Sequence, residues 1–147
     1  MLCAPRKGWR PVEVTDRRTR QDFAAILRDL ADGHFPEKKI TLVMDNLNTH
    51  KLSTLYDTFA PAEAKRIADR FAIHYTPKHG RWLNIAEIEI NVRSRQCLAR
   101  RIPDRETLTR EVRAWQDQRN ADTKPVDWRF TTDDARIKLK SLYPSIQ

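Results

Sequence analysis

The sequence predicts an α/β fold, because two short apolar runs lie among segments with helical periodicity. Ile40–Met44 and Phe71–Tyr75 have the length and composition of buried strands. Before, between and after these runs, apolar residues recur every three or four positions, as they do on one face of a helix. With 147 residues, the chain fits one domain with a core of its own.

The N-terminal part predicts an edge strand followed by a capped helix. Trp9–Val14 is predicted to form a strand, in which every second residue lies on the same face. Pro11 has no N–H to donate to a neighbouring strand, so it favours a strand at the edge of a sheet. Thr19 with Asp22 three residues later is a helix-capping signature, and Gly33 is expected to end that helix in the C′ position. The apolar stripe of this helix consists of Phe23, Ile26, Leu27 and Leu30.

The nearly continuous apolarity of Ile40–Met44 predicts a strand that is covered on both faces. Two helices are expected before the second strand, and Pro61 is placed at the start of the second of them. Their stripes are Leu52, Leu55, Tyr56 and Phe59 in the first helix, and Ala64, Ile67, Ala68 and Phe71 in the second.

Three helices are expected in the C-terminal half. A loop, Thr76–Leu83, leads into a long helix from about Asn84 to Arg101. Asp104 caps the next helix, and Thr131 with Asp134 caps a last short one. The predicted order β-α-β-α-α-β-α-α-α belongs to the α/β class.

The chain is strongly basic, which favours a polyanionic partner. It carries 28 Lys and Arg against 20 Asp and Glu, with a net charge of +8, and such cations gain free energy by displacing counterions from phosphates. The segment 92–102 contains no acid and includes Arg93, Arg95, Arg100 and Arg101. Two interpretations of this run stay open: a phosphate-binding strip and a solvated helix face.

Several function classes find no support in the sequence. It contains neither an apolar run of membrane-spanning length nor a signal peptide, so no membrane partner is expected. Cys3 and Cys97 are far apart, which argues against a disulfide framework or a cysteine zinc site and makes a cytoplasmic location the expectation. No glycine-rich phosphate loop and no nucleophile elbow occurs.

Asp45 is the first candidate for chemistry, since it directly follows the most apolar strand. Ligands of open α/β sheets gather beyond the carboxyl ends of the strands, where a carboxylate can hold a metal ion or a substrate. The alternative is an aspartate that caps the next turn together with Asn46 and Asn48. His50 is close enough in sequence to support Asp45, although a lone histidine is more often structural than a ligand.

The long C-terminal helix carries two acids, which helical geometry places on different faces. Glu87 shares a stripe with Asn91 and Ser94 beside apolar neighbours, where a carboxylate needs a counter-charge or a metal. Glu89 falls nearly opposite, four residues before Arg93, and is predicted to be a surface acid in an ion pair. Glu87 is therefore the candidate ligand. Its structural alternatives are hydrogen bonds to Asn84, Lys78 or Arg81.

Two motifs together resemble the catalytic domain of bacterial transposases of the mariner superfamily, in the insertion sequence 630 branch. They are the segment 45–50, DNLNTH, and the segment 75–87, YTPKHGRWLNIAE. The resemblance extends over the whole chain, from the segment 8–10 through the segment 94–98 to the end.

This resemblance implies a ribonuclease H-like fold in which three acids, the DDE set, hold two Mg²⁺ ions, or Mn²⁺, for DNA strand cleavage and joining. By motif position Asp45 matches the second acid and Glu87 the third, so both are the implied catalytic and metal-binding residues. The expected DNA-binding residues are Lys78, Arg81, Arg93, Arg95, Arg100 and Arg101.

Relative to the family pattern, the chain begins after the strand that carries the first acid. The expectation for residues 1–147 is thus an N-terminally truncated ribonuclease H-like domain with C-terminal helices, a partial DDE transposase catalytic domain that lacks the first strands and the helix-turn-helix region. The missing strand also predicts an exposed sheet edge. Glu13 and Asp16 are the local acids nearest the first role, and neither is assigned to it.

Two functions follow from this pattern. One is a DNA strand-transferase domain that is inactive alone and becomes active when another polypeptide supplies the missing acid. The other is a non-catalytic DNA-binding or regulatory remnant. The expected partners are transposon-end DNA and either a second copy of the chain or a full-length transposase.

Overall fold

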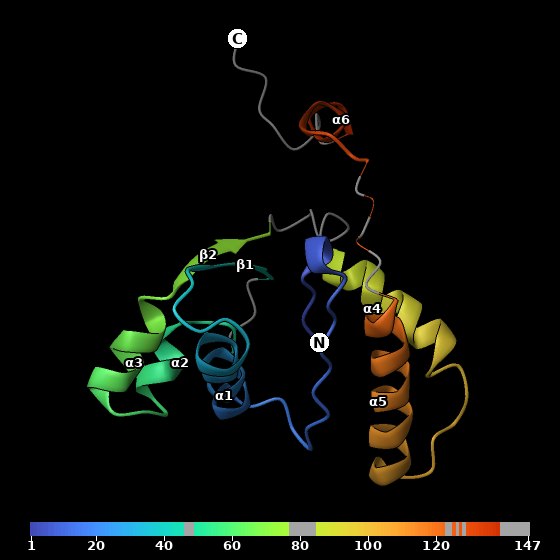
Figure 1. The fold of residues 1–147 in the computed structure, drawn as a ribbon, viewed down its shortest axis with the longest axis horizontal. Helices are drawn as coiled ribbons and strands as arrows, with labels where there is room; N and C mark the ends of the chain where they lie inside the picture. Colours follow the sequence, from blue (N-terminus) through green and yellow to red (C-terminus); the bar gives the residue numbers. More distant parts are fainter. Residues whose placement is uncertain (46–48, 77–84, 123–124, 126, 128, 139–147) are drawn as a thin grey trace.

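In the computed structural model, the helices and one small parallel sheet lie on either side of the N-terminal segment, residues 1–14 (Figure 1). The structure describes residues 1–45, 49–76, 85–122, 125, 127 and 129–138. The first group of elements comprises α1 (Arg20–Asp29), the π-helical turn η2 (Leu30–His34), β1 (Ile40–Met44), α2 (Ser53–Tyr56), α3 (Pro61–Ala68) and β2 (Phe71–Tyr75). The elements that follow are α4 (Ile85–Gln96), α5 (Arg105–Ala121) and α6 (Thr132–Lys138).

The two strands pair in parallel over their full length, from Ile40 beside Phe71 to Met44 beside Tyr75. Just past this register, the Thr76 N–H donates to the Met44 carbonyl at 2.9 Å. Both strand boundaries confirm the sequence prediction, and a parallel pair joined through helices is an α/β arrangement. The carboxyl ends of both strands point toward the side of the molecule on which α4 and α5 lie (Figure 1).

Within the described residues, helices cover only one face of this sheet, so the prediction of cover on both faces is wrong. Met44 and Phe71 are buried on the covered face. On the other face Thr41, Val43 and His74 are exposed, Val43 to 55 %. Apolar residues at every second position of β1 already suffice for one buried face, and the extra valine lies on the open one.

The first helix begins with the predicted capping box. Thr19 Oγ1 accepts a bond from the Asp22 N–H at 3.1 Å, and the Asp22 carboxylate accepts one from the Thr19 N–H at 2.8 Å. The helix does not end at Gly33, which lacks the positive φ of a C′ cap. It continues as η2 because the Phe35 N–H donates to the Leu30 carbonyl at 2.9 Å, which closes a wider turn.

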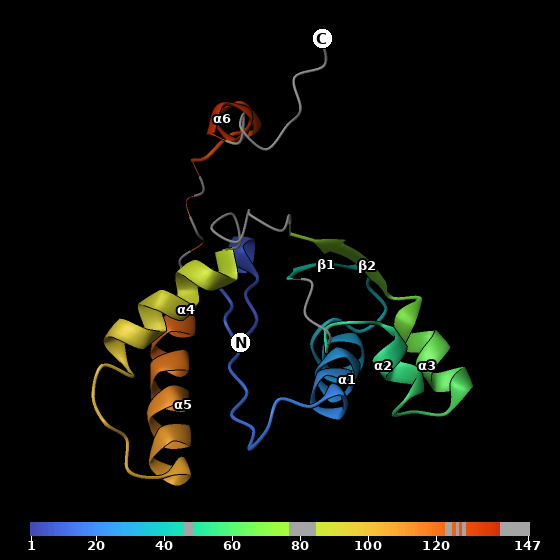
Figure 2. The ribbon, with the colours of Figure 1, turned by 180° about the vertical axis from the view of Figure 1, so that it is seen from behind.

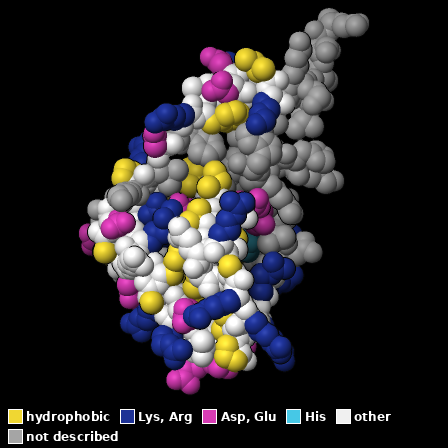
Figure 3. Space-filling view, turned by 90° about the vertical axis from the view of Figure 1, so that its right-hand side faces the viewer, with side chains coloured by type: hydrophobic (Ala, Val, Ile, Leu, Met, Phe, Trp, Pro, Cys, Tyr) yellow, Lys and Arg dark blue, Asp and Glu magenta, His cyan; other side chains and the backbone are white. Residues whose placement is uncertain are grey.

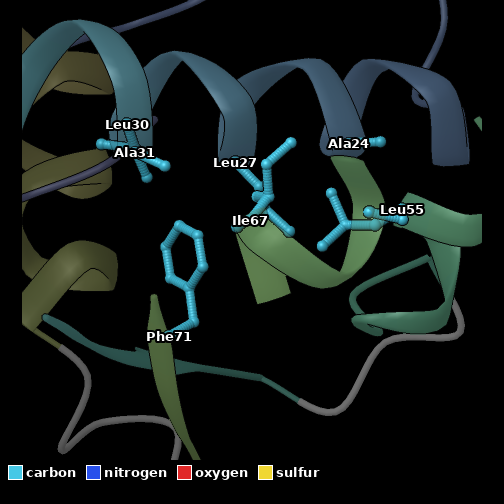
Figure 4. Close-up of a cluster of buried hydrophobic side chains, with 8 residues drawn as sticks. Ala24, Leu27, Leu30, Ala31, Leu55, Ile67 and Phe71 are labelled. Carbon is cyan, nitrogen blue, oxygen red and sulfur yellow. The ribbon is translucent and has the colours of Figure 1, made fainter. Parts of the chain in front are cut away.

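A first hydrophobic cluster lies where α1, η2, α2 and α3 meet the start of β2 (Figure 4). Its buried residues are Ala24, Leu27, Leu30, Ala31, Leu55, Ala64, Ile67 and Phe71. Pro61 occupies the first turn of α3, as predicted. The helix before it is a single turn, so the stripe predicted there is only partly correct: Leu55 is buried, whereas Tyr56 is 52 % exposed.

The N-terminal segment 1–14 folds back on itself instead of forming the predicted edge strand. Gly8, with a φ of 61°, reverses the chain after the short helix η1 (Pro5–Lys7). The reversal leaves one isolated antiparallel bridge between Ala4 and Trp9. In Figures 1 and 2 the segment runs between the two groups of elements.

The backbone of this segment is held by α5 rather than by a sheet. The Arg10 N–H donates to Asn120 Oδ1 at 2.8 Å, and the Val12 N–H donates to Gln116 Oε1 at 2.7 Å. The side-chain amide oxygens of Asn120 and Gln116 thus accept the hydrogen bonds that the carbonyls of a neighbouring strand would otherwise accept.

A second hydrophobic cluster joins α4, the residues directly after it and α5 to the N-terminal segment. Cys97, Val112 and Trp115 are its buried residues. Partly buried apolar side chains pack against them: Met1, Val12, Val14, Val92, Leu98 and Leu108. The Asp104 cap of α5 and the Thr131–Asp134 cap of α6 are confirmed by their hydrogen bonds.

The fourth helix is shorter than predicted, since it ends at Gln96 and not near Arg101. Arg100 and Arg101 therefore lie in the connection to α5, not on a helix face.

Replacing Ile67 by Ala should lower the free energy of unfolding by about 2–5 kcal/mol, because a buried side chain is removed from the first hydrophobic cluster. Ile137→Ala is the matched control: this isoleucine on α6 is 76 % exposed, and its loss should change stability by less than about 0.5 kcal/mol. Urea unfolding followed by circular dichroism compares the two. Equal losses would contradict the assignment of the core.

Candidate functional site

Asp45 lies directly after β1, at the carboxyl end predicted for it, with its side chain about one-quarter exposed. Its Oδ1 atom is 2.6 Å from His50 Nδ1. An ionised carboxylate only accepts hydrogen bonds, so Nδ1 carries the proton of this contact. This bond fixes one carboxylate oxygen, and no other described residue bonds to the carboxylate.

His50 is itself held by three contacts. Besides the contact with Asp45, the centroid of the His50 ring lies 4.9 Å from the centroid of the Phe23 ring on α1. The His50 carbonyl accepts a hydrogen bond from the Tyr75 hydroxyl at 3.2 Å. Tyr75 ends β2, so the carboxyl ends of both strands and α1 together orient the acid. Asn46 and Asn48, the partners in the alternative turn-capping role of Asp45, lie outside the described residues.

Glu87 lies in the first turn of α4 and is half-buried. It forms no ion pair with any described residue, whereas Asn84, Lys78 and Arg81, its proposed structural partners, lie outside the described ranges. Since no described cation pairs with this half-buried carboxylate, Glu87 stays the candidate metal ligand of α4. That Glu87 and Asp45 face each other across a short gap stays a prediction.

Glu89 is buried, at 3 % exposure, so its prediction as a surface acid paired with Arg93 is wrong. Its Oε2 atom is 2.9 Å from Arg10 Nε and 3.0 Å from Arg119 Nε, and Oε1 is 3.2 Å from Arg119 Nη2. Arg10 is equally buried, whereas the Arg119 side chain is about one-third exposed. We call these three residues the Arg–Glu–Arg triad.

The ionised form of Glu89 is the stable one in this environment. Burial by itself would raise the pKa of Glu89, but hydrogen bonds from Arg119 and Arg10 outweigh it and hold the pKa below its ordinary value. Both carboxylate oxygens are already in contact with guanidinium groups. A metal ion at Glu89 would have to displace two cations, so Glu87 stays the candidate ligand of α4.

The donor set fits a hard divalent cation in kind. Carboxylate oxygens are the ligands that Mg²⁺ and Mn²⁺ prefer, and Asp45 and Glu87 provide them. Among the described residues, no group of three or more His, Cys, Asp or Glu side chains could hold a metal ion together. Two carboxylates are fewer than a two-metal site uses.

The predicted DNA-binding arginines differ in their surroundings. Arg95 and Arg101 are exposed, but Arg100 Nη2 lies 2.9 Å from Glu111 Oε1 on α5. Arg93 is half-buried, and its Nε has no hydrogen-bond partner among the described residues. The face of α4 and α5 carries scattered Lys and Arg side chains with acids between them (Figure 3), and Lys78 and Arg81 lie outside the described ranges.

Sequence reasoning missed Arg10 and Arg119 as partners of Glu89. The i, i+4 rule directs attention to Arg93, which is on the same helix, whereas the actual partners lie on the N-terminal segment and on α5. The one usable signal was negative: α4 has too few apolar residues on one face to be held by apolar contacts alone.

A family model described as DDE superfamily endonuclease matches residues 1–109, a range that includes Asp45 and Glu87. No curated protein and no solved structure gives a significant match. In the described part of the chain, no helix is long and apolar enough to cross a membrane.

Replacing Glu89 by Ala should reduce the free energy of unfolding by about 3–5 kcal/mol, because it leaves buried guanidinium charge uncompensated. Glu87→Ala, two residues away, is the control and should cost less than about 1 kcal/mol. Urea unfolding at neutral pH measures both. A larger loss in the Glu87 variant would contradict the inward orientation of Glu89.

The stability of wild type and Glu89→Ala as a function of pH gives a second test of Glu89. The pKa of Glu89 is lowered on folding, so its stabilisation is fully present above the unfolded-state pKa of about 4.3 and is lost as the pH falls through the lower folded value. The stability difference between wild type and Glu89→Ala should therefore be constant from neutral pH to about pH 5 and shrink in stronger acid.

Proposed function

This chain belongs to the DDE superfamily endonuclease family, and on that basis we propose that it functions in DNA transposition, as part of the catalytic domain of a mariner-superfamily transposase of the insertion sequence 630 branch. The proposed reaction is metal-dependent DNA strand cleavage and transfer on a ribonuclease H-like fold. The observation that carries the proposal is that the family match includes both acids, one at the carboxyl end of a parallel strand and the other in the first turn of α4.

Asp45 and Glu87 are the proposed metal-binding residues, with Mg²⁺ as the expected ion and Mn²⁺ as a substitute. When bound, such an ion supplies Lewis-acid stabilisation of charge on phosphoryl oxygens. His50 holds one oxygen of Asp45 at 2.6 Å and thereby orients the carboxylate. Glu87 contributes a carboxylate without a competing ion pair among the described residues.

The proposed activity requires a further carboxylate from outside the site described above. Each acid removed from a hard-cation site lowers the charge that offsets dehydration of Mg²⁺, so two carboxylates hold one ion weakly. We therefore propose that the chain by itself does not cleave DNA and that another polypeptide that carries the missing acid, such as a full-length transposase, completes the site. A DNA-binding or regulatory fragment without catalysis is the second candidate, which the net charge of +8 supports.

Titration with Mn²⁺, followed by electron paramagnetic resonance of the free ion, tests the site. Asp45→Asn and Glu87→Gln should each weaken Mn²⁺ binding at least about tenfold, or 1.4 kcal/mol. Glu106→Gln is the control, because this exposed glutamate on α5 lies outside the proposed site. Wild type should not nick duplex DNA in Mg²⁺ or Mn²⁺.

Two outcomes would change the proposal. Mn²⁺ binding that does not depend on either acid would overturn the metal site and leave the DNA-binding alternative. Nicking that persists through purification and disappears in both acid variants would show that the site is complete without a partner.

DNA binding by Arg95 and Arg101 can be measured through its salt dependence. If both contact phosphates, the negative slope of log K against log salt should become shallower by roughly two units in the Arg95→Ala/Arg101→Ala variant, since each contact contributes about −0.9 to the slope. The effect should be similar on all sequences. Arg129→Ala/Arg136→Ala is the control, because these exposed arginines pair with Asp127 and Asp133. An unchanged slope would identify Arg95 and Arg101 as solvated surface.

A further inference from the structure

The attachment of α4 to the rest of the protein is unusual, because its one buried residue is an acid. Glu89 is buried, whereas Ile88 and Ile90 are 42 % and 36 % exposed. Val92 contributes a partly buried apolar contact to the second hydrophobic cluster. Apolar packing alone therefore does little to fix the rotation of α4 about its own axis. The contacts of Glu89 with Arg10 and Arg119 are directional, so they can fix this rotation.

The partners of Glu89 are themselves fixed. Arg10 Nη1 donates to the Gly8 carbonyl at 2.6 Å, and the Arg10 N–H donates to Asn120 on α5. Arg119 contacts both carboxylate oxygens through two guanidinium nitrogens, so it constrains the plane of the carboxylate as well as its position.

Glu87 and Glu89 are two residues apart on the same helix, so their side chains project about 200° from each other. Any rotation of α4 that moves Glu89 away from its arginines turns Glu87 by the same angle. The direction in which Glu87 projects is thus coupled to the triad.

We propose that Glu89 is a positioning residue: the Arg–Glu–Arg triad fixes the rotation of α4 so that Glu87 is held in the direction required for metal binding with Asp45. The inference rests on the proposed function for its metal-binding consequence. The rotation itself is a property of the fold and can be measured without any metal.

The first test replaces the whole triad by apolar residues, Arg10→Met, Glu89→Leu and Arg119→Met, in the full chain. Replacing all members of a buried ionic group together is often neutral or stabilising, so the melting temperature should be equal to or above that of wild type. Mn²⁺ affinity should nevertheless fall by about 10–100-fold, as expected for loss of groups that orient a ligand. Adding Glu87→Gln to this variant should cause no further loss.

The outcome separates positioning from structure. A triple variant that binds Mn²⁺ as wild type does, with the affinity still dependent on Glu87, would overturn the proposal. If the triple variant fails to fold, Arg119→Lys replaces it: lysine keeps the charge but not the planar fork, so Mn²⁺ affinity should fall while most of the stability remains. Wild-type affinity in Arg119→Lys would likewise count against positioning by this residue.

A second measurement needs no metal. Spin labels at Thr41→Cys on β1 and Asn91→Cys on α4, both exposed positions, report the distance between these elements in a Cys3→Ser/Cys97→Ala background. The distance distribution should be broader in the triple variant or in Arg119→Lys than with the intact triad. An unchanged distribution would overturn the proposal. Failure of Mn²⁺ to depend on Asp45 and Glu87 would overturn only the proposed function.

Discussion

The buried carboxylate of Glu89 connects three parts of the chain that are distant in sequence: the N-terminal segment, α4 and α5. An isolated carboxylate at this depth would be protonated or would unfold its surroundings. Here two guanidinium groups compensate it, and the excess positive charge falls on Arg119, whose side chain is partly exposed. The Cζ atom of Arg119 lies 5.9 Å from the centroid of the Trp115 ring. The charge imbalance of the triad is thereby placed where water can screen it.

The two groups of elements consequently rest on different physical interactions. α1, α2 and α3 are held by apolar side chains with little or no exposure, centred on Leu27 and Ile67. α4 and α5 share a smaller apolar cluster and depend more on directed hydrogen bonds, including the one that Trp115 Nε1 donates to Gln96 Oε1 at 3.0 Å. The N-terminal segment contributes to both: Trp9 packs on the first cluster and Val12 on the second. Removing Glu89 alone would therefore destabilise α4 and α5 first.

Features encoded by neighbouring residues were predictable from the sequence. The bounds of both strands and the caps at Thr19, Asp104 and Thr131 depend on residues at most a few positions apart, and the structure contains them as predicted. Gly33 was not predictable in this way, because the hydrogen bond donated by Phe35 decides whether the helix stops or widens. Cover on one face of the sheet also depends on where distant helices pack, which the apolar run of β1 does not encode.

The two glutamates of α4 show where sequence reasoning about a site reaches its limit. The helical period correctly separates Glu87 from Glu89, but the period cannot say which of them faces inward, since the partners of Glu89 come from Arg10 and Arg119. The assignment of Glu89 to the surface was wrong, yet the choice of Glu87 as candidate ligand does not fall with it. An acid neutralised by two arginines has no oxygen free for a cation, so the burial of Glu89 leaves Glu87 as the candidate ligand on this helix.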